Sequence, residues 1–168
     1  MTMIKGLHHN AYRCRDSEET HRFYEAFLGL RLAGTLEIKE TKSGRKTETL
    51  HTFYELGDGS YLAFFEAPDI PFEFKPQHDY DLHIALEVAE AELAPWLAKG
   101  KAGGIDSRGI SEHGFIRSIY FRDPNGYVIE LTAKRPNHAS EMNPATNGAR
   151  DKLDRWQAAK KERAAAPA

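Results

Sequence analysis

The chain has 168 residues, a formal net charge of −2 at pH 7 and one cysteine, Cys14. Its length suits one domain or two small repeats that share a core, and a single cysteine excludes an intramolecular disulfide. The balanced charge argues against nucleic acid and anionic membranes as partners, and without a long apolar run we expect a cytoplasmic protein with no membrane span or signal peptide.

Residues 1–67 are predicted to form a first βαβββ module. A β-rich run over 7–15 leads to Asp16, which suits a helix N-cap with Glu19 three residues later as its capping-box partner. The helix should end before Gly29, because glycine is the usual residue after a helix C-terminus. The pattern predicts this helix over 17–27 and further strands over 31–38, 47–56 and 61–67.

Residues 81–133 are predicted to form a second βαβββ module, after a proline-containing linker loop over 68–80. Its last two strands flank the sequence Asp123-Pro124-Asn125-Gly126, which is typical of a tight turn. The other expected elements are a strand over 81–88, a helix over 90–99 and a weak strand over 103–108.

The two modules show weak internal similarity. When their first strands are laid over each other, His9 aligns with His83, and when their last two strands are compared, Tyr54 aligns with Tyr120. Because these matches fall on the same predicted elements, they favour a true repeat. The predicted fold class is therefore α+β, with paired βαβββ modules forming a half-open, eight-stranded barrel-like sheet.

Residues 134–168 form a C-terminal extension of different character. Pro136 and Pro144 interrupt its first part, and residues 148–164 are rich in Ala, Lys and Arg. Leu153 and Trp156 lie on one face of the helix expected there. We expect this helix to dock through Trp156 onto the domain or onto a second subunit.

Three polar residues stand out in the predicted strands. Glu130 lies in the middle of an apolar strand, where a carboxylate is destabilising unless it is paired or binds a metal. His9 and His83 occupy equivalent positions in the two first strands, so the set predicts a 2-His-1-carboxylate metal site. The alternatives are a glutamate on a solvated sheet face, hydrogen-bonded core histidines, and His8 instead of His9 as the first ligand.

Three segments carry a family resemblance: HHNAYRCRD…FYEAFLGL, DLHIALEV and SIYFRDPNGYVIEL. Together they resemble the vicinal oxygen chelate superfamily, which includes glyoxalase I, methylmalonyl-CoA epimerase, fosfomycin-resistance enzymes and type I extradiol dioxygenases. The resemblance covers residues 4–133 and leaves out the tail. It implies paired modules around a divalent metal, with His9, His83 and Glu130 at ligand positions.

Glu66 decides between branches of the superfamily. Glyoxalase-like members usually have a fourth protein ligand on the last strand of the first module, where Glu66 is the candidate. The alignment of Tyr54 with Tyr120 instead aligns Phe64 with Glu130. Glu66 then lies two residues after the position that corresponds to the Glu130 ligand, on the same face of the strand. Three ligands and an apolar wall at Phe64 resemble the extradiol dioxygenases, which also place a tyrosine where Tyr120 stands, ten residues before Glu130.

A dioxygenase also needs an acid–base group near the metal. His113 is the nearest candidate in sequence, although its spacing does not match the dioxygenase motif, and His51 is the second. Arg13 shares a face with His9 and is either an anion clamp or an ordinary surface arginine. The phenylalanines that could line an aromatic pocket are Phe53, Phe64, Phe72 and Phe74.

We therefore predict a metal-dependent enzyme that acts on a small aromatic molecule, with ring-cleaving dioxygenase chemistry favoured and Tyr120 and His113 as catalytic residues. The expected metal is Fe(II), with Mn(II), Zn(II) or Ni(II) as alternatives, and the expected assembly is a homodimer. One alternative is a glyoxalase-like lyase or isomerase that uses Glu66 as fourth ligand or base. Another is a drug-binding resistance protein that needs no metal.

Overall fold

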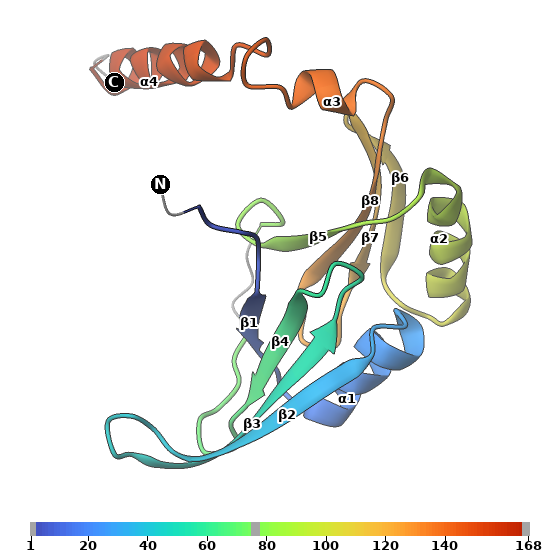
Figure 1. Cartoon of the computed structure of the whole chain (residues 1–168), viewed down its shortest axis with the longest axis vertical. Helices are drawn as coiled ribbons and strands as arrows, with labels where there is room; N and C mark the ends of the chain where they lie inside the picture. Colours follow the sequence, from blue (N-terminus) through green and yellow to red (C-terminus); the bar gives the residue numbers. More distant parts are fainter. Residues whose placement is uncertain (1–2, 75–77, 166–168) are drawn as a thin grey trace.

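The computed structural model describes residues 3–74 and 78–165 (Figure 1). The described chain is an α+β fold with two βαβββ modules and a C-terminal helix, as predicted. In the first module the elements are β1 His9–Arg13, α1 Ser17–His21, η1 Arg22–Phe27, β2 Leu32–Glu40, β3 Lys46–Glu55 and β4 Tyr61–Glu66.

The helix of the first module begins and ends where the sequence predicts. Asp16 caps it, since its Oδ1 accepts a hydrogen bond of 2.7 Å from the backbone N–H of Glu19. Its second half, η1, is π-helical and delivers the fully buried Tyr24 to the core. Gly29 then adopts a φ of 78°, a conformation that glycine reaches without steric strain.

The second module repeats this order of elements: β5 His83–Glu87, η2 Glu90–Glu92, α2 Leu93–Ala102, β6 Ser107–Glu112, β7 Ile116–Arg122 and β8 Val128–Lys134. The strand predicted over 103–108 in fact begins at Ser107. Gly103 and Gly104 instead terminate α2, Gly104 with a φ of 69°. The predicted hairpin is confirmed, with β7 and β8 pairing antiparallel across the turn.

Each module contributes one four-stranded sheet, in the orders β1-β4-β3-β2 and β5-β8-β7-β6. No strand pairing joins the two sheets in the described parts of the chain. Figure 1 shows α1 and α2 next to each other on one side of the molecule. Phe27 links the two halves of the core there, with its ring 5.2 Å from that of Phe121 and 5.7 Å from that of Trp96.

Strand register relates the two modules and corrects one expectation. His9 lies opposite Tyr61, and His83 lies opposite Val128, which agrees with the alignment of the two histidines. The same pairing makes Ala63 the counterpart of Glu130, so the tyrosine alignment, which placed Phe64 there, is wrong by one position. Because a slip of one residue turns every side chain to the other face, Phe64 lies in the core with 0% exposure. The expected apolar wall at Phe64 is therefore wrong.

The turn between β7 and β8 joins the modules through buried polar groups. Asp123 accepts hydrogen bonds from the backbone of Asn125 and Tyr127 and, at 3.0 Å, from the hydroxyl of Tyr24. Burial raises the pKa of the Asp123 carboxyl despite these donors. Asn125 in turn accepts a 2.8 Å hydrogen bond from the backbone of Arg15, so the turn fixes the chain that leads from β1 into α1.

The tail contains a short helix, α3 His138–Glu141, and the predicted long helix, α4 Ala149–Ala165. Figure 1 shows α4 standing away from both sheets. Trp156 is 62% exposed, and the Arg163 guanidinium lies 5.3 Å from its ring centre. In this structure Trp156 does not dock onto its own domain, because no surface of the described chain covers it. None of the helices described, α4 included, is long and apolar enough to cross a membrane.

Candidate metal centre

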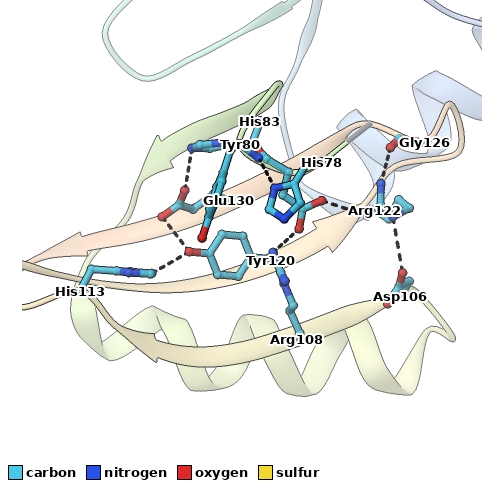
Figure 2. Close-up of polar contacts among 11 residues, drawn as sticks. His78, Tyr80, His83, Asp106, Arg108, His113, Tyr120, Arg122, Gly126 and Glu130 are labelled. Atoms are coloured by element: carbon cyan, nitrogen blue, oxygen red, sulfur yellow. Dashed lines mark hydrogen bonds and ion pairs between the residues drawn. The ribbon is translucent and has the colours of Figure 1, made fainter. Parts of the chain in front are cut away.

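The second sheet gathers polar side chains on the face that α2 leaves open. Glu130 in β8 lies between Ala85 of β5 and Tyr120 of β7. Because paired residues point to the same side of a sheet, this register shows which side chains of β5 and β7 share a face with Glu130. His83 precedes Ala85 by two residues and therefore points the same way. Figure 2 shows His83, Glu130, Tyr120 and His113 converging on this face.

His83 and Glu130 face each other through atoms that bind metals. The Nδ1 atom of His83 lies 2.9 Å from the backbone oxygen of Asp79, and because a carbonyl only accepts, Nδ1 carries the proton. The free lone pair of Nε2 then points toward Oε2 of Glu130, 3.3 Å away. Two electron-pair donors at this distance need a cation between them, either a proton or a metal ion. Ligand atoms each about 2.0–2.2 Å from a shared ion would lie about 3 Å apart, so the pair fits a metal.

Hydrogen bonds hold the Glu130 carboxylate from its other side. Glu130 is 5% exposed, and its Oε1 accepts from the Ser118 hydroxyl and, at 3.4 Å, from the Tyr120 hydroxyl. The Tyr120 oxygen also lies 2.8 Å from Nε2 of His113. Burial and the neighbouring Glu130 carboxylate raise the pKa of Tyr120. The predicted residues His113, Tyr120 and Glu130 are thus in contact, and Ser118 joins them as a residue that the sequence analysis missed.

Two arginines and an aspartate border this group and were also missed. The Arg108 guanidinium lies over the Tyr120 ring, 4.5 Å from its centre. The Asp79 carboxylate forms ion pairs with Arg108 and, at 3.3 Å, with Arg122. Asp79 belongs to the linker before β5, where the sequence has no periodic pattern, so only its proximity to His83 could have drawn attention to it.

The open face of the first sheet is aromatic. His51 is 6% exposed and stacks on Phe65 with ring centres 3.7 Å apart, while Phe53 lies 4.2 Å from it. Nδ1 of His51 donates a 2.9 Å hydrogen bond to the backbone oxygen of Phe64. Burial lowers the pKa of His51, which favours the neutral ring with a free acceptor at Nε2.

The three predicted metal ligands do not meet within one chain. His9 lies on the first sheet, with its ring 5.6 Å from Phe53 and 6.1 Å from His51. Across residues 3–74 and 78–165, no three His, Cys, Asp or Glu side chains are close enough to share a metal ion. The physical reason is the topology, because β1 pairs only with β4 and its sheet is not joined to the one that carries Glu130. His8, the rival ligand, lies beside His9, with 2.8 Å between their Nδ1 atoms.

Glu66 does not belong to this site. Its Oε2 accepts a 2.8 Å hydrogen bond from the backbone N–H of Ser17 at the start of α1. Tyr61 pairs with His9, so alternation along β4 places Glu66 on the opposite, helix-covered face. The structure therefore places Glu66 away from the face that carries His83 and Glu130, and gives no support to its expected role as fourth ligand or base.

The other candidates from the sequence divide between site and scaffold. Phe53 lies on the open face of the first sheet, whereas Phe74 packs on Tyr127 with ring centres 5.5 Å apart. Phe72 lines a separate surface hollow of about 360 Å³ between β1 and the linker. Arg13 donates hydrogen bonds to the backbone oxygens of Ala67 and Ile70, which makes it a structural residue.

Comparison with known proteins gives a consistent result. The model of the Glyoxalase/Bleomycin resistance protein/Dioxygenase superfamily matches residues 6–131. A protein assigned as the ring-cleaving dioxygenase MhqA of Bacillus subtilis is 30% identical over 114 residues, which are 67% of this chain but only 36% of that relative. The metallothiol transferase FosB of Bacillus licheniformis is 30% identical over 130 residues, 76% of this chain and 75% of the relative.

A solved structure supports the fold. The fosfomycin resistance protein FosX of Listeria monocytogenes, complexed with Mn(II) and sulfate, superposes with a TM-score of 0.61 at 20% identity. The match covers 82% of this chain and 99% of FosX, so it includes both modules.

Proposed function

The chain belongs to the Glyoxalase/Bleomycin resistance protein/Dioxygenase superfamily, and from that premise we propose that it is a divalent-metal enzyme that cleaves the ring of an aromatic diol with dioxygen. The observation that carries the proposal is the contact of His83 and Glu130 beside the Tyr120–His113 pair on an open sheet face. The position of Glu66 on the other face supports it, because three protein donors leave more coordination positions for substrate and dioxygen than four.

The third ligand in this proposal is His9 of a second copy of the chain. One chain brings together only His83 and Glu130, and His9 is exposed on a separate sheet. In a homodimer the first sheet of one copy would face the second sheet of the other, and the two open faces would enclose one site. A 2-His-1-carboxylate set with open positions suits Fe(II), and Mn(II), Zn(II) or Ni(II) are the alternatives. FosX, which shares the fold, binds Mn(II).

The two faces would supply different parts of the chemistry. A bound metal would lower the pKa of a coordinated substrate hydroxyl and so favour the diolate at neutral pH. Tyr120 and His113 would move a proton at the substrate, because their 2.8 Å contact lets one group resupply the other. His51 offers a neutral acceptor on the opposite face. Phe53 and Phe65 beside it provide an apolar surface for an aromatic ring.

The test is oxygen consumption by protein purified without air. We expect Fe(II) in the purified protein, oxygen uptake when a catechol is added, and a yellow ring-opened product. Tyr120→Phe should retain the metal and lose about 10²–10⁴-fold in rate. Tyr12→Phe is the matched control, because Tyr12 packs on Tyr127 away from the site.

Two results would contradict the proposal. Metal-loaded protein that consumes no oxygen with any catechol would reject the dioxygenase reaction and leave the metal site standing. Folded protein that binds no divalent metal but binds an aromatic drug would favour the drug-sequestering alternative. The experiment therefore separates the reaction from the site.

A further inference from the structure

The segment His78–Asp81 crosses the open face of the second sheet just before β5. Within it, Asp79 uses both its backbone and its side chain. The backbone oxygen accepts the 2.9 Å hydrogen bond from Nδ1 of His83, and the carboxylate pairs with Arg108 and Arg122. Asp79 therefore connects the imidazole of His83 to strands β6 and β7.

Both arginines are themselves held in place. Arg108 lies over the Tyr120 ring, and Arg122 donates a 2.7 Å hydrogen bond to the backbone oxygen of Gly126 in the β7–β8 turn. Arg122 also lies 3.7 Å from Asp106. Figure 2 shows Arg108 and Arg122 on the same side of Tyr120. The position of Asp79 is thus set by Arg108 of β6 and Arg122 of β7.

Apolar packing does not hold this segment. Tyr80 is 90% exposed, and its ring touches only that of His78 among the aromatic contacts of the described chain. Local hydrogen bonds shape the turn, since the backbone N–H of His78 donates to Asp81 and that of Tyr80 donates to His78. None of these local bonds reaches the sheet. Among the residues that the structure describes, the ion pairs of Asp79 with Arg108 and Arg122 connect this turn to β6 and β7.

We infer that Asp79 is a positioning residue for His83, held by Arg108 and Arg122. Its backbone oxygen keeps the proton of His83 on Nδ1, and this leaves Nε2 free to face Glu130. Partners of this kind orient metal-binding histidines, and their loss typically weakens metal affinity about 10–100-fold. The inference rests on the proposed metal site, but its first consequence, the tautomer of His83, exists without a metal.

The experiment compares Asp79→Ala with the unchanged protein by two measurements. Nitrogen-detected NMR of the metal-free protein, assigned with His83→Ala, reports the tautomer of His83. Titration with Zn(II) or Mn(II) reports metal affinity. In the metal-free unchanged protein we expect Nδ1 of His83 to carry a proton hydrogen-bonded to Asp79, with a second proton shared between Nε2 and Glu130. In Asp79→Ala we expect Nδ1 to be only partly protonated and the metal affinity to fall about tenfold.

Two further variants make the test specific. Asp69→Ala is the matched control, because Asp69 forms a comparable ion pair with Arg45 in the first module and should change neither measurement. The double variant Arg108→Gln and Arg122→Gln leaves Asp79 intact and should reproduce the effects of Asp79→Ala. It also replaces Asp79→Ala as the test if that variant does not fold.

The outcomes are separable. Folded variants with an unchanged His83 tautomer and unchanged affinity would overturn the inference. If the unchanged protein binds no divalent metal, the proposed function fails, and the NMR measurement alone then decides the role of Asp79.

Discussion

The two modules have the same order of strands but opposite chemistry on their open faces. Strand register makes Phe53 the counterpart of Tyr120, His51 the counterpart of Ser118 and Ala63 the counterpart of Glu130. The first face is therefore aromatic and lacks a carboxylate at the central position, whereas the second carries a hydrogen-bonded carboxylate. The repeat therefore preserves the backbone geometry, while the side chains on the two open faces differ.

The largest expected effect is the loss of the carboxylate from the second face. Glu130→Gln removes the charge that faces Nε2 of His83, so tight binding of Mn(II) or Zn(II) should disappear in calorimetric titrations. Glu87→Gln is the matched control, because Glu87 in β5 lies on the same sheet face as Glu130 but is exposed and pairs with Lys134. Equal metal affinity in the Glu130→Gln and unchanged proteins would show that the second face is not the metal-binding half.

A second prediction asks whether the two faces come from different copies. His9→Ala should weaken metal binding strongly, while His8→Ala should leave it nearly intact. When His9→Ala and Glu130→Gln chains are unfolded together and refolded, mixed dimers should regain one intact site each, about a quarter of all sites for random pairing under two-fold symmetry. No recovery on mixing would mean that both faces of a site belong to one chain.

The sequence predicted the elements better than their relation to each other. Local signals such as the Asp16 cap and the Asp123–Gly126 turn depend on neighbours in the chain, and the structure confirms both. The register of β4 depends on pairing with β1, and two tyrosine matches misplaced it by one residue, enough to put Glu66 on the wrong face. Asp79 was missed because its role arises from contacts with β6 and β7, which no local pattern encodes.

The candidate site shows the same limit. The contact of Glu130 with Tyr120 was predictable, because the two residues lie on adjacent strands of one hairpin. Their spacing and the alternation of side chains along each strand place both on the same face. His113 lies just outside β7 and reaches Tyr120 only through the path of the β6–β7 loop. His9 and His83 are separated because of how the two modules pack against each other. The internal repeat predicts the strands of each module but not this packing.

The smallest expected effect is that of Trp156 in the exposed tail helix, and Trp96 in the second module serves as its comparison. Trp96 packs against Phe27, with ring centres 5.7 Å apart, and Lys99 lies over its ring. Trp156 on α4 is 62% exposed. At low protein concentration, Trp156→Ala should change the free energy of unfolding by less than about 0.5 kcal/mol. Trp96→Ala should lower it by about 3 kcal/mol, the lower end of the range for buried aromatic residues, because Trp96 is only partly buried.

Urea denaturation followed at several protein concentrations makes this contrast decisive for the tail. If Trp156→Ala is neutral in dilute protein but destabilising in concentrated protein, α4 docks onto a second copy, because only association depends on concentration. A loss comparable to that of Trp96→Ala at every concentration would instead mean that α4 folds back onto its own chain in solution. In that case the tail would belong to the core of the domain, and the contrast between the exposed helix and the paired modules would fail.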